Sequence, residues 1–211
     1  MKLVIFGPTG GTGEQLVQQA LDAGHVVTAV ARHPEAISLV HPRLDVLQGD
    51  VLDPVWPGSG IGGADAVLSA LGSRELGKPT TVYSVGTTEI LTAMAVNGVT
   101  RFVGISATPV GPDEQKSPLD RCLVHPLLHR FFGPGYDDMR RMEVILAASQ
   151  SEWTVYRPPR LTNGSLTGKG RTAIGRRLPR AWNLSRSNLA AAMIGAISDP
   201  ATVRRAITIA N

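Results

Sequence analysis

A short apolar segment that runs straight into a glycine-rich turn is the feature that most limits how this chain can fold. Residues 2–6 are apolar apart from Lys2, and glycines follow at positions 7, 10 and 13 in the sequence GPTGGTG. Residues 12–23 then carry apolar side chains at helical spacing. A strand, a tight turn and a helix in direct succession predict a unit whose helix N-terminus points unpaired N–H groups at an anion.

The spacing of these glycines suits a diphosphate. The first glycine permits a sharp turn, the second lets the backbone approach a pyrophosphate, and the third lets the helix pack on the sheet. The absence of a following Gly-Lys-Ser/Thr excludes the phosphate loop of nucleoside triphosphatases. The alternative is a glycine turn that binds no ligand. We expect a dinucleotide to bind at the turn from Gly7 to Gly13.

The rest of the chain alternates strand and helix patterns, which predicts an α/β, doubly wound Rossmann fold around a mostly parallel sheet. Further strands are expected at residues 25–31, 43–48, 64–70, 101–106, 153–157 and 205–209. Helices are expected at 80–97, 119–132, 137–149 and 186–197, with Ser185 or Ser187 as the cap of the last. The Gly-Pro-Gly at 133–135 is expected to divide two helices, and 162–177 to form a loop or small hairpin excursion on the substrate side.

Composition bounds the class of protein. With 211 residues, 43% hydrophobic and 18% charged, the chain is expected to be one globular domain over 1–211. Its single cysteine, Cys122, is expected to be a buried apolar side chain rather than a nucleophile. Neither a signal peptide nor a membrane span is apparent, so we expect a cytoplasmic protein without membrane partners.

The end of the second predicted strand indicates which dinucleotide binds. NAD-binding proteins place an acidic residue there for the ribose 2′-hydroxyl, whereas this chain has Arg32 and His33 and no acid at the strand end itself. Arg32 suits a 2′-phosphate, and this predicts NADP(H), with His33 as a further hydrogen-bond partner. The alternatives are an ordinary strand-end arginine and a loop histidine.

Asp50 follows the third predicted strand, between Gly49 and Val51. It is expected either to reach the adenine edge, with the Val51 amide beside it, or to serve only as a turn residue.

A long basic segment occupies residues 153–198, which contain no Asp or Glu. Its basic residues are Arg157, Arg160, Lys169, Arg171, Arg176, Arg177, Arg180 and Arg186. They form either a solvated face or a rim that attracts an anionic cofactor or substrate. No zinc-finger, RNP-like or basic heptad motif accompanies them, so we expect a small-molecule partner rather than nucleic acid, and no metal.

The glycine turn, Arg32, the sequence Gly-Asp-Val at 49–51 and the sequence Ala-Leu-Gly at 70–72 together resemble the atypical short-chain dehydrogenases/reductases. The similarity is to NAD(P)H-binding proteins of the NmrA-like and biliverdin reductase B (flavin reductase) type, and 138–143 and 153–160 resemble them too. The resemblance implies that Gly7, Thr9, Gly10, Gly11, Thr12 and Gly13 hold the pyrophosphate. It also implies that Ala70, Leu71, Gly72, Arg74, Ser106, Arg157, Pro158 and Pro159 line the cofactor.

The resemblance places Ser106 near the nicotinamide, which makes it a catalytic candidate. The alternative is that it is only a serine at the end of a strand. It also places the segment Arg157-Pro158-Pro159 beside the carboxamide, with a carbonyl left free there.

One departure concerns the proton donor. Typical short-chain dehydrogenases use Tyr-x-x-x-Lys, and this chain has no such pair. Tyr136 is a candidate donor, and the alternative is that it only packs. We therefore expect an NADPH-dependent reductase that transfers hydride to a planar acceptor such as a flavin or quinone. A non-catalytic NADP(H) sensor is the alternative, and monomer and dimer both stay open.

Overall fold

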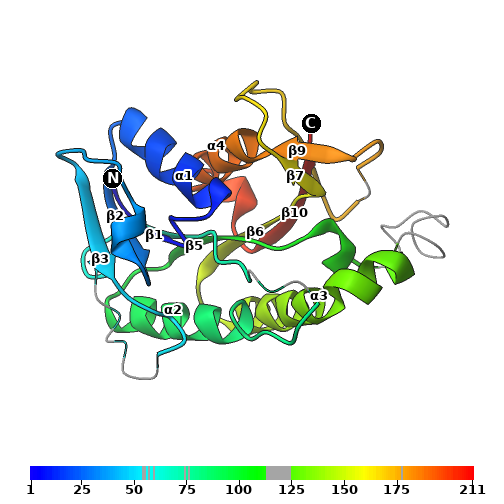
Figure 1. Cartoon of the computed structure of the whole chain (residues 1–211), viewed down its shortest axis with the longest axis horizontal. Coiled ribbons are helices and arrows are strands. Elements are labelled where there is room, and N and C mark those ends of the chain that lie inside the picture. The colour runs from blue at the N-terminus through cyan, green and yellow to red at the C-terminus, as the bar shows by residue number, and fades with distance from the viewer. Residues whose placement is uncertain are drawn as a thin grey trace.

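A central sheet organises the chain in the computed structural model, which describes all residues except 54, 55, 57, 59, 74, 76, 113–124 and 177, and describes only the backbone at 125–129. Eight described strands lie in the order β3-β2-β1-β4-β5-β6-β10-β8 (Figure 1). All neighbours are parallel except β8, which runs antiparallel to β10. The strands are β1 (Lys2–Phe6), β2 (Val26–Ala31), β3 (Leu44–Gln48), β4 (Ala66–Ser69), β5 (Arg101–Ile105), β6 (Glu152–Arg157), β8 (Arg171–Ile174) and β10 (Arg205–Ala210). The predicted mostly parallel sheet is confirmed.

Helices cover both faces of this sheet. In Figure 1, α1 (Gly11–Asp22) and α4 (Arg186–Ala196) lie on one face, and α2 (Ser84–Val96) and α3 (His125–Ala148) lie on the other. Among the described residues, no helix combines the length and the apolar character needed to cross a bilayer. The arrangement is the doubly wound fold predicted from the alternation of strands and helices.

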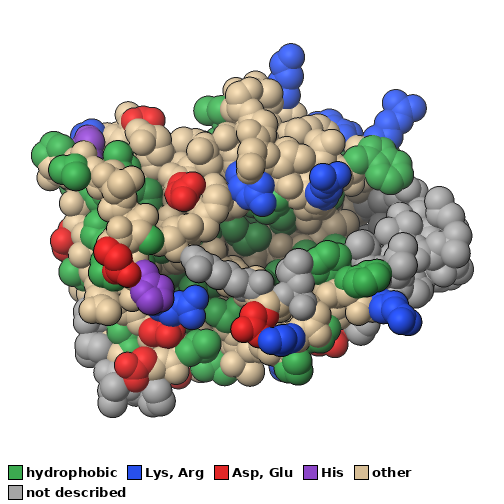
Figure 2. Space-filling view, in the orientation of Figure 1, with side chains coloured by type: hydrophobic (Ala, Val, Ile, Leu, Met, Phe, Trp, Pro, Cys, Tyr) green, Lys and Arg blue, Asp and Glu red, His purple; other side chains and the backbone are tan. Residues whose placement is uncertain are grey.

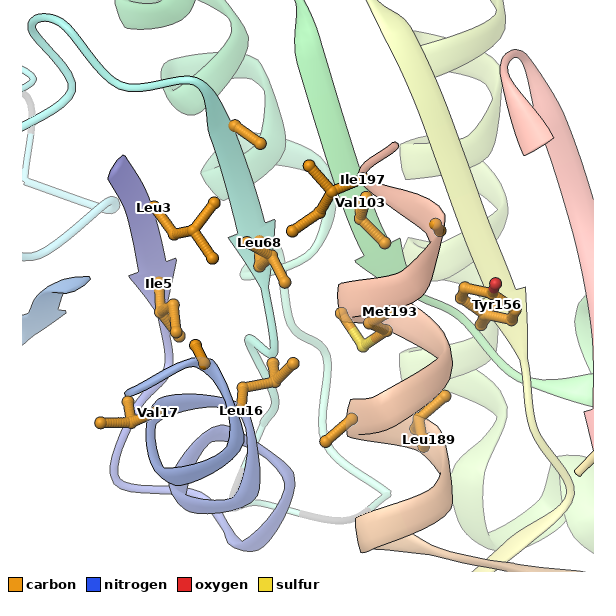
Figure 3. Close-up of a cluster of buried hydrophobic side chains, with 14 of the residues drawn as sticks. Leu3, Ile5, Leu16, Val17, Leu68, Val103, Tyr156, Leu189, Met193 and Ile197 are labelled. Atoms are coloured by element: carbon orange, nitrogen blue, oxygen red, sulfur yellow. The ribbon is translucent and has the colours of Figure 1, made fainter. Parts of the chain in front are cut away.

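Alternate side chains along the strands form a hydrophobic core on each face of the sheet. Leu3 and Ile5 of β1 pack in the cluster under α1 and α4 (Figure 3), whereas Val4 and Phe6 belong to the cluster on the other face. Successive strand residues point to opposite faces, so a continuous apolar run of this kind is what a strand buried on both sides requires.

Local helix signals in the sequence are confirmed. The helix α2 ends at Val96, with Asn97 as its C-cap and Gly98 at φ +69°. At α4, Ser185 is the N-cap, and its side chain accepts a hydrogen bond from the Asn188 N–H at 3.1 Å. The cap is therefore Ser185 and not Ser187.

The predicted division of the long helix is wrong. The helix α3 continues through Pro134 over 24 residues, and Gly133 is buried within it. Proline lacks an N–H and removes one intrahelical hydrogen bond. The helix continues because it packs along α2 and carries the buried side chains of Met142 and Leu146.

The predicted excursion at 162–177 is only partly a loop, because β8 extends the main sheet at its edge. A separate parallel pair, β7 (Arg160–Thr162) and β9 (Asn183–Ser185), stands beside it, so no hairpin joins these strands. The sequence missed both pairings because each joins residues that are distant along the chain.

The topology fixes where a ligand can bind. Strands β2 and β3 lie on one side of β1, and β4 to β6 lie on the other side, so the chain reverses direction across the sheet between β1 and β4. In open α/β sheets the loops at the carboxyl ends of the strands diverge at such a point and leave a crevice.

Close contact between the two ends of the β1–α1 turn sets the position of α1. Gly7 adopts φ +72°, and a Cβ atom at Gly13 would lie 2.0 Å from the Gly7 carbonyl oxygen and 2.8 Å from the Pro8 Cα. Only glycine fits at position 13, since the neighbouring atoms are all backbone.

Replacing Gly13 with alanine is expected to lower the free energy of unfolding by about 3 kcal/mol, because the backbone atoms around the new methyl group cannot move aside. Gly10→Ala is the matched control, since its Cβ would lie 3.6 Å from the same oxygen, an ordinary contact. We expect that control to lose less than about 1 kcal/mol. Urea unfolding followed by circular dichroism measures both, and equal losses would contradict the packing role of Gly13.

Candidate functional site

A cleft of about 700 Å³ opens at the carboxyl ends of the strands, beside β1 and β4. The molecule is hollowed between the α1–α4 side and the α2–α3 side, as the space-filling view in Figure 2 shows. The predicted site residues that line the cleft are Gly7, Thr9, Gly10, Gly11, Thr12, Arg32, His33, Gly49, Asp50, Val51, Ala70, Leu71, Gly72, Ser106, Pro158 and Pro159. The structure therefore brings together residues from six separate loops.

The glycine turn forms one end of the cleft. The N-cap of α1 is Gly10, which offers no side-chain acceptor to the N–H groups of the first turn. A helix N-terminus without such a cap carries a partial positive charge and unsatisfied donors. Gly13 does not line the cleft and instead packs under Gly7.

Arg186 reaches the same end of the cleft from α4, and the sequence did not single it out as a cofactor residue. A Cβ atom on Gly11 would lie 2.9 Å from the Arg186 Cδ and 3.1 Å from its Nε, so the side chain rests on the start of α1. The guanidinium donates to the Asn163 Oδ1 at 2.6 Å. Among the described basic residues of 153–198, Arg186 alone lines the cleft. Its only sequence signal was membership of that basic segment.

Arg32 and His33 stand at the end of β2, where both side chains are exposed along the cleft. The His33 Nδ1 lies 3.2 Å from a carboxylate oxygen of Glu35. No ion pair joins Arg32 to an acidic side chain among the residues that the structure describes. Its guanidinium can therefore meet an anion at the cleft.

Asp50 is a turn residue that also lines the cleft. Its Oδ1 accepts a hydrogen bond from the Leu52 N–H at 2.9 Å, which makes it a turn residue, and it also lines the cleft. Beside it, Val51 is buried in the core and Gly49 leaves no room for a side chain against Val30 and Trp56. The loop after β3 thus presents backbone and one carboxylate to the cleft.

Ser106 lies at the opposite end, just after β5. Its side chain is 2% exposed, and its Oγ is a buried polar atom without a hydrogen-bond partner in the described structure. Its N–H donates to the Tyr156 carbonyl at 2.8 Å, which fixes the backbone. A buried hydroxyl without a partner is costly, so this group is available to a ligand that enters the cleft.

The segment after β6 lines the cleft with Pro158 and Pro159, whereas the Arg157 side chain turns away. Arg157 pairs with Glu143 of α3, with its Nε 2.9 Å from a carboxylate oxygen. The Thr108 N–H and hydroxyl donate to the carbonyls of Pro158 and Arg157 at 2.9 and 3.1 Å, so the Pro159 carbonyl is the candidate for the free one.

One further predicted residue, Tyr136, does not join this arrangement. Tyr136 is not among the described residues that line the cleft, and its ring centroid lies 6.1 Å from that of Phe132. Burial raises the pKa of Tyr136. Arg74 and Cys122 lie outside the described residues.

Tyr83 and Met139 line the cleft although the sequence assigned them no role there. Tyr83 is the N-cap of α2 and Met139 belongs to α3, and these helices pack against each other, which adjacent sequence could not reveal. The cleft thus has two different ends: one offers helix N–H groups and guanidinium groups suited to phosphates, and the other offers apolar side chains with the hydroxyls of Ser106 and Tyr83.

Comparison with known proteins identifies the family of the chain. The family described as NAD(P)H-binding matches residues 7–200. The chain is 32% identical over 120 residues to a 3β-hydroxysteroid dehydrogenase/Δ5→4-isomerase of Mycobacterium tuberculosis, over 52% of this chain and only 32% of that protein's length.

Two solved structures have the same fold. A short-chain dehydrogenase/reductase of Veillonella parvula in complex with NADP superposes with a TM-score of 0.79 at 18% identity, covering 100% of this chain and 94% of that one. A putative exported protein of Burkholderia pseudomallei superposes with a TM-score of 0.82 at 23% identity, covering 100% of both chains. The chain belongs to the NAD(P)H-binding family, as the resemblance in its sequence implied, and shares its fold with these two structures.

Proposed function

We propose that this protein is an NADPH-dependent reductase that transfers hydride to a small planar acceptor such as a flavin or a quinone. The observation that carries the proposal is the two-ended cleft, in which an anion-binding glycine turn and an apolar end with the unpartnered Ser106 hydroxyl share one space. The NADP that is bound in the Veillonella parvula structure supports the choice of cofactor.

The residues present fit this cofactor. The glycine turn leaves no Cβ in the way of a diphosphate, and Arg32 offers a planar cation for the 2′-phosphate. Asp50 and the Val51 amide would face the adenine, and Ser106 and Pro158 would face the nicotinamide. Bound NADPH supplies the hydride, while the protein holds it, orients the acceptor and excludes water.

Arg32→Ala is expected to weaken NADPH binding by about 10- to 100-fold, because a hydrogen-bonded charge pair is lost. NADH lacks the 2′-phosphate, so its affinity should change by less than about threefold. Titration calorimetry with both nucleotides measures this, and Arg160→Ala, an exposed arginine outside the described cleft lining, is the control. Equal losses for the two nucleotides would remove the 2′-phosphate role.

Arg186 is expected to bind the diphosphate, because its guanidinium rests on the positive N-terminus of α1 and has no described acidic partner. Two positive groups so close are unfavourable unless an anion lies between them. Arg186→Ala should therefore weaken NADPH and NADH alike, by about tenfold. Calorimetry on this variant beside Arg32→Ala separates the two roles, and a loss confined to NADPH would place Arg186 on the 2′-phosphate instead.

A non-catalytic NADP(H) sensor is the second candidate, and one observation favours it: no lysine lines the cleft in the described part of the chain. A stopped-flow record of NADPH absorbance with a panel of flavins and quinones separates the candidates. We expect oxidation of NADPH that depends on the acceptor. Tight NADPH binding without turnover on any acceptor would favour the sensor.

A further inference from the structure

Tyr83 occupies a fixed position at the apolar end of the cleft. It is the N-cap of α2, and its N–H donates to the Asp138 Oδ2 at 2.9 Å. The Ser84 N–H donates to the same oxygen at 3.3 Å, and the Ser84 hydroxyl donates to the other. Asp138 is fully buried, and Arg141 forms an ion pair with it at 3.2 Å. A carboxylate of α3 thus caps the positive end of α2 and fixes the backbone of Tyr83.

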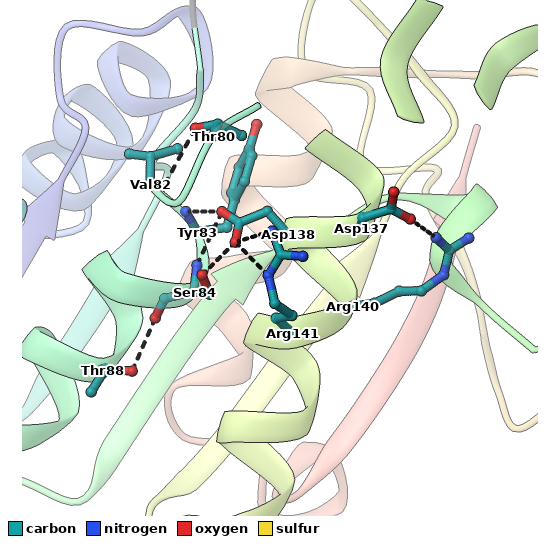
Figure 4. A network of polar contacts seen from close by, with 9 residues as sticks. All are labelled: Thr80, Val82, Tyr83, Ser84, Thr88, Asp137, Asp138, Arg140 and Arg141. Carbon is teal, nitrogen blue, oxygen red and sulfur yellow. Dashed lines mark hydrogen bonds and ion pairs between the residues drawn. The ribbon is translucent and has the colours of Figure 1, made fainter. Parts of the chain in front are cut away.

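The oxygen of the Tyr83 hydroxyl already accepts one hydrogen bond, whereas its O–H donates to no described residue. The ring stands away from the carboxylate that holds its backbone (Figure 4). The Ser73 N–H donates to the Tyr83 oxygen at 3.3 Å, and no hydrogen bond from this hydroxyl to a described residue is present. Because the side chain lines the cleft, a ligand there is the partner to which this O–H can donate.

The surroundings keep this phenol protonated. Burial is the largest effect and raises the pKa of Tyr83; the Ser73 hydrogen bond opposes this rise, and the Asp138 charge adds a smaller rise. Tyr83 is therefore a proton donor at neutral pH and not a tyrosinate.

The cleft around Tyr83 also limits the substrate. The described lining at this end includes Val82, Ile105, Met139 and Pro158, together with the serines Ser73 and Ser106. Within the described lining, the acidic and basic residues belong to the phosphate end: Arg32, His33, Asp50 and Arg186. An uncharged molecule with apolar substituents and one hydrogen-bond acceptor fits such a surface.

We propose that Tyr83 donates its proton to the oxygen of a carbonyl acceptor, which makes an apolar carbonyl compound the substrate class of this cleft. The proposal rests on the reductase function proposed above. Tyr83 gives its proton to the carbonyl oxygen while the carbonyl carbon receives the hydride that NADPH supplies. The phenol O–H bond, the C=O π bond and the C–H bond of the reduced nicotinamide break, and a C–H bond on the carbonyl carbon and a new O–H bond form. The carbonyl is reduced to an alcohol, NADPH is oxidised to NADP⁺, and the tyrosinate takes a proton from water.

Tyr83→Phe tests this step with two acceptors. Phenanthrenequinone is a planar apolar dicarbonyl, whereas FMN spreads the negative charge of hydride addition over its ring and needs no acid in that step. We expect kcat to fall about 100-fold or more with phenanthrenequinone and to stay within about threefold with FMN. Calorimetry on the NADP⁺-loaded protein gives a second readout, and the Kd for phenanthrenequinone should rise about fivefold through the lost hydrogen bond.

Other outcomes overturn the proposal. An equal fall with both acceptors, or a lower urea midpoint, would make Tyr83 merely structural, and no fall with either would leave it without a role in proton transfer. Tyr136→Phe tests the alternative donor, and loss of quinone reduction in that variant alone would move the role there. Wild-type protein that reduces neither acceptor would contradict the reductase function itself, whereas wild-type turnover unaffected by Tyr83→Phe overturns only the proton donor.

Discussion

The contact of Gly13 with the Gly7 carbonyl is the constraint on which the rest of the structure depends. It brings the first turn of α1 against the end of β1, beside the point where the chain crosses the sheet. A side chain at position 13 would push the helix outward and carry its N–H groups away from the cleft. The position of the helix N-terminus at this end of the cleft is therefore a consequence of backbone packing, and in the proposed function Arg32 would only add selectivity to it.

Helix packing then links the two ends of the sequence at this point. Because α4 lies against α1, Arg186 at the start of α4 meets Gly11 at the start of α1. The guanidinium and the α1 N-terminus repel each other, and a diphosphate bound between them would attract both groups. A ligand that binds only the folded state stabilises it by mass action. Binding here would therefore strengthen the contact between the first and the last helical segments of the chain.

The sequence predicted the features that depend on neighbouring residues and missed those that depend on distant ones. The glycine turn and the Ser185 cap could be read directly, because each is a hydrogen-bonded or steric requirement within a few residues. The Gly-Pro-Gly sequence was misleading because packing along α2 outweighs one lost hydrogen bond at Pro134. Arg186 and Tyr83 could not be assigned, since their places in the cleft depend on which helices meet.

The sheet separates the two tasks of the cleft. The α1–α4 side provides the helix N-terminus and Arg186, whereas the α2–α3 side provides Tyr83, held by Asp138. Because the two layers contact the cleft from opposite faces of a rigid sheet, a substitution on the α2–α3 side can change the acceptor without moving the groups that face the phosphates. Asp138 limits substitution on this side, because its buried carboxylate caps the start of α2. A substitution that removes the carboxylate leaves the N–H groups there without a partner. Substitutions that preserve the proposed reductase activity should therefore occur in the apolar lining around Tyr83, and not at Asp138, which holds the Tyr83 backbone in place.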